Sequence, residues 1–356
     1  MLTEDAGRIP VVVGLCGAGR TSLLHRLHAD FGPSESQYVN VERTATTPER
    51  FLAALTGSSP FLDTRPAPVA LRPREAFDAV LAFLAGARGA EHGPVTFLLD
   101  ETLEFRTFES FPGLRRALPE LLAVIASSPN RFVLTSRYAA RTARALSSAS
   151  PKFVVMPMPA LADEELKRMV AAALPASRAG AADADTVESD ATIGLLASLS
   201  GGRPAYARAI VDAMAARSGV ESTADPVSAL AAEMEANAAL CLMCAFSYEL
   251  RLHRARGYGA LKAILEILAE EEPLTLTEIA LRLGRTPGST KDYLSWLEDV
   301  DLVAVDQKRY RFRDPLMRMW TRLHCRSTPP TRETIGREVQ RYVGVCAAPP
   351  SPPARG

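Results

Sequence analysis

The sequence lacks the features that mark several protein classes. It carries 41 Lys and Arg against 41 Asp and Glu, so no net charge draws the whole chain toward nucleic acid or membrane. No apolar run approaches the roughly 20 residues that span a bilayer. The five cysteines are odd in number and scattered, which argues against a disulfide framework. Met1 to Gly7 contains no apolar targeting core. We therefore expect a cytoplasmic protein whose basic surface, if any, is local.

Short apolar runs alternate with helical patterns over residues 1–158. Five runs have the length and composition of buried strands, and they lie at 11–15, 38–41, 95–100, 131–135 and 153–156. Between the first two, residues 21–31 place their leucines on one helical face. This alternation predicts an α/β fold with a parallel sheet covered by helices on both faces. The ligand site of such a sheet lies at the carboxyl ends of its strands.

A glycine-rich turn follows the first predicted strand. Residues 14–21 fit the phosphate-binding pattern G-x-x-x-x-G-K-[ST], except that Arg20 replaces the lysine. Glycines let backbone N–H groups wrap around phosphate oxygens, the helix N-terminus attracts the same anion, and the Thr21 hydroxyl can ligate Mg²⁺. The predicted nucleotide-binding residues here are Gly14, Gly17, Ala18, Gly19, Arg20, Thr21 and Ser22. The alternative is a glycine-rich turn that binds nothing.

Arg20 keeps the positive charge of the missing lysine but presents a planar fork instead of a compact ammonium. It can still hold the β- and γ-phosphates and is expected to lower turnover more than binding. We therefore predict nucleotide binding and leave open whether ATP and water are converted to ADP and phosphate.

The predicted strand at 95–100 ends in two carboxylates, Asp100 and Glu101. Asp100 is expected to hold Mg²⁺ together with Thr21, directly or through water. Glu101 is expected to orient and deprotonate the attacking water. An ordinary acidic loop after a strand is the alternative, and the position of the pair relative to the phosphate loop weighs against it.

With both motifs placed, residues 8–326 resemble the STAND and AAA+ branches of the P-loop ATPases, and in particular the archaeal-type ATPase group. The resemblance implies sheet order 5-1-4-3-2 and Mg²⁺-ATP as ligand. Residues 132–137 resemble the fourth-strand sensor, which implies that Arg137 contacts the γ-phosphate. Residues 199–204 resemble the G-x-P signature of the helical lid. There Pro204 is expected near the base, and Arg203 as a second sensor.

Residues 259–326 predict a separate module. A helix with an apolar stripe at 261–268 precedes a capping-box helix at 275–284, a third helix from Thr286 onward, and an alternating hairpin at 303–312. This order is typical of a winged helix. The segment 314–320 also resembles the one that closes this module in the archaeal-type ATPases.

If the module binds double-stranded DNA, its third helix enters the major groove and the wing meets phosphates. The residues expected at DNA are Ser289, Thr290, Lys291, Lys308, Arg309, Arg311 and Arg313. Residues 273–326 hold ten Lys and Arg against seven Asp and Glu, which is only mildly basic. A winged helix that packs on the ATPase core, on a protein partner or on a second copy is therefore an equal alternative.

The predicted organisation has five parts: an ATPase core at 1–158, a helical lid at 159–217, linker helices at 218–258, the winged helix at 259–326 and a tail at 327–356. The tail is expected to be mostly disordered apart from one helix at 335–343. Cys241 and Cys244 form a pair without a second pair of metal ligands, so a buried helix face is the preferred interpretation. Three hypotheses follow. They are a switch ATPase, a non-hydrolysing nucleotide-responsive DNA-binding regulator, and a protein-interaction scaffold with a vestigial nucleotide site.

Overall fold

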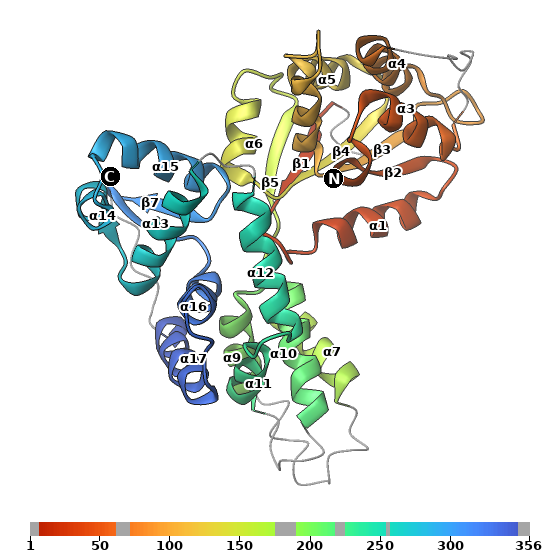
Figure 1. The fold of residues 1–356 in the computed structure, drawn as a ribbon. Helices are drawn as coiled ribbons and strands as arrows, with labels where there is room; N and C mark the ends of the chain where they lie inside the picture. Colours follow the sequence, from red (N-terminus) through yellow and green to blue (C-terminus); the bar gives the residue numbers. More distant parts are fainter. Residues whose placement is uncertain (1–6, 62–71, 175–189, 218–224, 254–256, 348–356) are drawn as a thin grey trace. The chain divides into compact units, whose positions relative to one another are not determined.

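The computed structural model describes residues 7–61, 72–174, 190–217, 225–253 and 257–347. The chain divides into two compact units, Met1–Met158 and Pro159–Gly356, whose elements Figure 1 labels. Two stretches of loop-like composition fall largely outside the described residues. They are the Pro- and Ser-rich stretch at 57–73 and the small, polar stretch at 176–190.

The first unit is built on a five-stranded parallel sheet in the order β2-β3-β4-β1-β5, which confirms the predicted order 5-1-4-3-2. The strands are β1 Ile9–Val13, β2 Ser36–Asn40, β3 Thr96–Asp100, β4 Arg131–Ser136 and β5 Phe153–Pro157. β2 ends one residue earlier than predicted, because the Asn40 side chain accepts a hydrogen bond from Arg43 N and caps a helix that begins at Val41. In the register, Asn40 pairs with Asp100 and Val13 with Ser136, so the carboxyl ends of these strands lie together.

Helices cover both faces of this sheet (Figure 1). One face packs its Val12, Leu98 and Val133 against Leu24 of α1 (Arg20–Phe31). The other face carries the larger core, with a group of phenylalanines from several elements. The elements that close it include α3 Pro48–Gly57, α4 Pro73–Gly86, the 3₁₀ helix η1 Thr102–Ser110 and α5 Ala117–Ser127. The short α2 Val41–Thr44 and α6 Ala139–Leu146 complete the unit.

The second unit begins with a helical layer. Its helices are α7 Asp163–Ala173, α9 Asp190–Ser200, α10 Pro204–Arg217, α11 Pro226–Glu233 and α12 Ala239–Leu252. In the stretch at 218–258, where linker helices were predicted, the described residues form α11 and α12. Gly202 makes the turn before α10 possible, because its φ is +65° and an added Cβ would lie 2.4 Å from the Ala160 Cβ.

A winged helix follows, as predicted. It consists of α13 Tyr258–Glu270, β6 Leu274–Thr275, α14 Leu276–Leu283, α15 Pro287–Asp299, β7 Val303–Asp306 and β8 Arg309–Phe312. Its three strands pair in the order β6-β8-β7. The predicted capping box between Thr275 and Glu278 is present. Leu261, Leu294 and Leu297 from the two longer helices are fully buried and form part of its core.

Two further helices follow the winged helix. α16 spans Pro315–His324, and α17 spans Arg332–Ala347, which contains the helix predicted at 335–343 and extends it at both ends. Ile335, Val339 and Tyr342 repeat at helical spacing and are buried, and the Tyr342 hydroxyl donates to Leu199 O at 2.8 Å. The packing of this apolar face on the rest of the second unit stabilises α17. No helix in the described ranges is long and apolar enough to cross a membrane.

Candidate nucleotide-binding site and nucleic-acid surface

The phosphate loop joins the carboxyl end of β1 to the N-terminus of α1. Gly17 and Gly19 have φ values of 81° and 91°, which side chains other than glycine rarely adopt. Gly14 is needed for another reason: a Cβ there would lie 3.0 Å from the Ala18 Cβ. The first turn of α1 contains no acidic residue. The loop therefore offers tightly turned backbone and an uncompensated helix N-terminus, the two elements that attract phosphate.

Asp100 lies at the end of β3 and gathers three hydroxyl groups. Thr21 and Tyr38 donate to its Oδ2 at 2.8 and 2.9 Å, and Thr135 donates to its Oδ1 at 2.5 Å. Burial, with a further contribution from the Asp100 charge, raises the pKa of Tyr38 to about 12, so its hydroxyl is a donor at neutral pH. The carboxylate is 1% exposed and held in one orientation beside Thr21. The two residues predicted to share Mg²⁺ are thus in direct contact.

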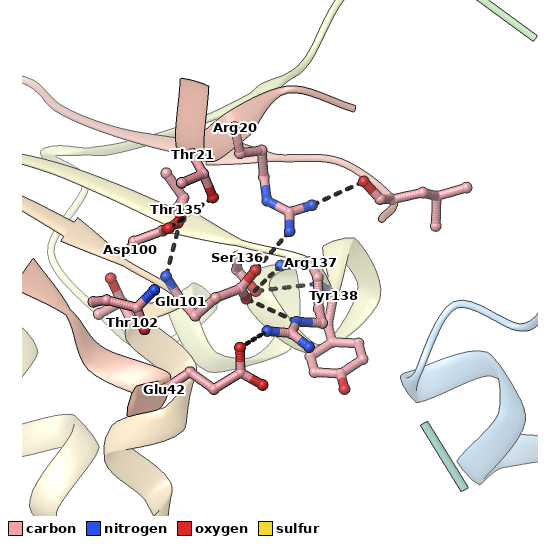
Figure 2. Close-up of polar contacts among 12 residues, drawn as sticks. Arg20, Thr21, Glu42, Asp100, Glu101, Thr102, Thr135, Ser136, Arg137 and Tyr138 are labelled. Atoms are coloured by element: carbon pink, nitrogen blue, oxygen red, sulfur yellow. Dashed lines mark hydrogen bonds and ion pairs between the residues drawn. The ribbon is translucent and has the colours of Figure 1, made fainter. Parts of the chain in front are cut away.

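Glu101 lies between two arginines (Figure 2). Its Oε1 accepts from Nη2 of Arg20 at 2.5 Å. Its Oε2 lies 3.1 Å from Nε of Arg137 and accepts from the Arg137 backbone N–H at 3.0 Å. Glu101 adopts φ 58° at this point, a left-handed conformation that is uncommon outside glycine. The predicted catalytic base is therefore paired with two buried cations.

Arg137 also contacts a residue that the sequence did not point to. Its Nη2 donates to the carboxylate of Glu42, which belongs to α2. Burial lowers the pKa of Arg137, but the charges of Glu101 and Glu42 outweigh it and the net shift is upward. Arg20, Glu101, Arg137 and Glu42 thus form a chain of alternating charge along the carboxyl edge of the sheet (Figure 2).

The site fits a nucleotide with a magnesium ion. The loop residue Arg20 is 8% exposed, and among the described residues its Nε has no hydrogen-bond partner, although its Nη1 donates to Leu15 O at 3.0 Å. A buried donor without an acceptor is costly unless a ligand oxygen completes it. Thr21 and Asp100 supply the hard oxygen ligands that Mg²⁺ prefers. The residues that would hold Mg²⁺-ATP are those of the loop with Thr21 and Asp100.

Arg203, predicted to be a second sensor in the lid, has a partner within the second unit. The Arg203 guanidinium forms an ion pair with Asp314 and lies 4.0 Å from the centre of the Tyr206 ring. The Tyr206 hydroxyl also donates to Asp314, at 3.1 Å. Burial alone would raise the pKa of Asp314, but Arg203 outweighs it and the pKa lies below its ordinary value. A contact between Arg203 and nucleotide would require this ion pair to open. Pro204 starts α10, and its expected place near the base stays a prediction.

The nucleic-acid surface predicted on the winged helix is only partly available. Lys291 on α15 is exposed, and so are Lys308, Arg309, Arg311 and Arg313 on the wing. Thr290, in contrast, is fully buried and donates its hydroxyl to Thr286 O at 3.0 Å. Its expected contact with DNA is therefore corrected: Thr290 is a packing residue of α15. Ser289 is half-buried.

The cysteine pair lies on a packed helix face, as expected. Cys244 is fully buried and Cys241 is 6% exposed. The Cys241 thiol lies 3.5 Å from Nε2 of His324. Across the described ranges, no group of three His, Cys, Asp or Glu side chains could hold a metal ion. The predicted Mg²⁺ site is of a different kind, because it consists of one carboxylate, one hydroxyl and the phosphates themselves.

Sequence reasoning missed Tyr38, Glu42 and Asp314. Tyr38 and Glu42 lie in and just after β2, so a search for polar residues at the carboxyl end of every strand would have found them. Asp314 offered the N-cap signal Asp-Pro, but nothing in the sequence linked it to Arg203.

Comparison with known proteins agrees with both parts of the architecture. Residues 262–307 match the IclR helix-turn-helix domain family. Among solved structures, a Walker-type ATPase of Pyrococcus abyssi is 17% identical, with a TM-score of 0.62 over 88% of this chain and 91% of that one. RuvB of Thermotoga maritima is 16% identical over 86% of each chain, with a TM-score of 0.37 that carries no further argument. No curated protein sequence matches. The chain thus has a P-loop ATPase fold followed by a winged helix similar to the IclR type.

Proposed function

We propose that this chain is a nucleotide-responsive DNA-binding regulator, which binds Mg²⁺-ATP at the phosphate loop and DNA through the winged helix. The observation that carries the nucleotide half is the geometry at Arg20 and Thr21. Within the described part of the chain, the buried Nε–H of Arg20 has no acceptor at the N-terminus of α1, while the Thr21 hydroxyl already contacts the Asp100 carboxylate. A triphosphate with its magnesium ion supplies the acceptors and the cation for which these groups are arranged.

Bound Mg²⁺-ATP would supply a phosphoanhydride bond that water can hydrolyse. Glu101 is the residue predicted to activate that water. Activation of water requires a free carboxylate, whereas Glu101 is paired with Arg20 and Arg137. We infer that the nucleotide-free site is held inactive. If hydrolysis occurs, Arg20 must first turn from Glu101 toward the phosphates. A lysine at this position would keep a more compact charge on the phosphates.

The nucleic-acid half rests on the exposed cations of the wing and on Lys291. They present positive charge to a phosphate backbone without the base-edge contacts expected from Thr290. We therefore expect DNA binding that depends strongly on salt and weakly on sequence.

A gel-shift titration of double-stranded DNA tests the function as a whole. It uses low and raised salt, with and without Mg²⁺-ATP. We expect a shift at low salt whose midpoint changes at least threefold when ATP is added. No shift under any condition would remove DNA binding. A shift that ATP leaves unchanged would remove the regulatory coupling.

Phosphate release from wild type and Glu101→Gln separates a switch ATPase from a regulator that binds without hydrolysis. Mg²⁺-dependent release that Glu101→Gln abolishes supports the first. Binding without release in either protein supports the second.

A protein partner for the winged helix is the second candidate, and one observation favours it. Leu281 on α14 is 82% exposed, and Val305 on the wing is 46% exposed. Apolar side chains on the surface of a mildly basic module suit a protein contact better than a phosphate backbone. Substitution Leu281→Ser would leave the DNA shift unchanged while weakening such a contact.

A further inference from the structure

Glu42 is an acidic residue of the candidate site that neither the phosphate loop nor the β3 motif accounts for. It lies on α2, which begins directly after β2 and is capped by Asn40. Its carboxylate accepts a hydrogen bond from Nη2 of Arg137. The Glu42 side chain is 36% exposed, whereas the Arg137 side chain is 9% exposed. One end of this ion pair is therefore solvated and the other is not.

The two acidic partners of Arg137 use different edges of its guanidinium. Glu101 lies at 3.1 Å from Nε and also accepts from the Arg137 backbone N–H, so two contacts hold it. Glu42 engages only the terminal Nη2 (Figure 2). A planar fork can keep one edge occupied while its terminal nitrogen changes partner. Glu42, and not Glu101, is thus the partner that Arg137 can exchange at lower cost, because a released Glu42 carboxylate returns to water.

We propose that Glu42 is a positioning residue that limits the preference of the site for ATP over ADP. It holds Nη2 of Arg137 in the nucleotide-free protein, and the terminal phosphate of ATP replaces it. ADP lacks that phosphate and leaves the Arg137–Glu42 pair intact. Breaking this pair makes the binding free energy of ATP less favourable and leaves the binding free energy of ADP unchanged. This inference rests on the proposed nucleotide site.

The test is calorimetric titration of the full-length protein with Mg²⁺-ATP and Mg²⁺-ADP. In Glu42→Gln the competing charge is removed while size and shape are kept. We expect the ratio of ATP affinity to ADP affinity to rise about three- to tenfold, as for a partly exposed charge-assisted pair. A general gain in phosphate attraction would raise both affinities together, so the ratio isolates the exchange. Glu42→Asp should return the ratio toward the wild-type value.

Two further variants make the result specific. Glu35→Gln removes an exposed acid that precedes β2 in the same unit, and it should leave the ratio unchanged. In an Arg137→Lys background, Glu42→Gln should lose most of its effect, because the two changes act through one contact. The melting temperature of each nucleotide-free variant shows that it folds.

The outcomes are distinguishable. An unchanged or reduced ratio in Glu42→Gln, with wild type binding both nucleotides, overturns the role of Glu42 and leaves the proposed function standing. An equal gain for both nucleotides also overturns it. Failure of wild type to bind either nucleotide overturns the proposed function and this inference together.

Discussion

The carboxyl edge of the sheet and the wing of the second unit both carry charges of the candidate sites, but in opposite physical settings. At the sheet edge, Arg20 and Arg137 are less than 10% exposed and paired with acids. On the wing, Lys308 and Arg311 are exposed. Buried pairs resist salt and depend on geometry, whereas exposed cations act through net charge and are screened. A switch can therefore reside at the first site while the second supplies affinity.

The largest expected effect tests whether the contribution of a charged residue to the free energy of unfolding depends on its burial and not on its residue type. Asp314 and Asp225 both cap a helix immediately before a proline, but only Asp314 is buried against an arginine. We expect Asp314→Asn to lower the free energy of unfolding by about 3–5 kcal/mol, because Arg203 is left without its countercharge. Asp225→Asn, an exposed cap, should cost about 1 kcal/mol or less. Equal costs in denaturant titrations would contradict this distinction.

The same pair gives a dependence on pH. The folded-state pKa of Asp314 lies below its ordinary value, so its carboxylate stabilises the fold above about pH 4 and this contribution is lost as the pH falls further. Between pH 5 and pH 3, wild type should therefore lose more stability than Asp314→Asn. Parallel curves of unfolding free energy against pH would contradict the assignment.

The next effect concerns the metal. Asp100→Asn keeps the shape of the side chain but removes the charge expected to hold Mg²⁺. Mg²⁺ should strengthen ATP binding less in this variant than in wild type. Loss of an outer-shell partner of a metal costs about 10- to 100-fold in metal affinity, and we expect loss of a direct ligand to reduce the Mg²⁺-dependent gain in ATP affinity by at least that factor. Affinity measured with a chelator present should change little. If magnesium strengthens ATP binding equally in both proteins, Asp100 is not a ligand.

On the wing the effect should be smaller and sensitive to salt. Replacing Lys308, Arg309 and Arg311 by Gln should weaken DNA binding about tenfold at low salt. The slope of log affinity against log salt should fall by about 2 to 3. Arg309 contributes least, because it already donates to Pro273 O at 3.1 Å. The matched control replaces three exposed arginines of the first unit: Arg115, Arg116 and Arg131. A similar loss in that control would mean that the wing is not the contact surface.

The smallest expected effects distinguish the roles of two adjacent residues on α15, Thr290 and Lys291. Thr290→Val removes a buried hydroxyl that donates to Thr286, so it should cost about 1 kcal/mol of stability and leave DNA affinity unchanged. Lys291→Ala should do the reverse, with a few-fold weaker gel shift and unchanged stability. A loss of DNA affinity in folded Thr290→Val would restore that residue to the interface.

Much of the fold followed from local patterns. The five apolar runs predicted the strands, and the order of three helices and a hairpin predicted the winged helix. The burial of Thr290 was also encoded, because it lies seven residues before Leu297 and so on the same helical face. The periodicity of the sequence does not identify which residues contact each other across long stretches of the chain. No local signal links Arg203 to Asp314, although both are engaged in one buried ion pair.

At the nucleotide site, sequence placed the residues but not their contacts. The motifs put Arg20, Asp100 and Glu101 after the carboxyl ends of β1 and β3, which lie on either side of β4 at one edge of the sheet. The contact between Arg20 and Glu101 depends on side-chain rotamers and on the reach of arginine. The motif assumes a lysine and could not indicate this. The length of α17 was missed for a related reason, since its stability comes from tertiary packing and not from helix propensity.

The most direct test of the central claim is a calorimetric titration of the wild-type chain with ATP, ADP, GTP and AMP in the presence of magnesium. We predict saturable binding of ATP at one site per chain, weakened by Gly19→Val, which places a side chain on a residue whose φ is 91° at the start of α1. Absence of heat and of any protection against thermal unfolding at millimolar ATP would contradict the account.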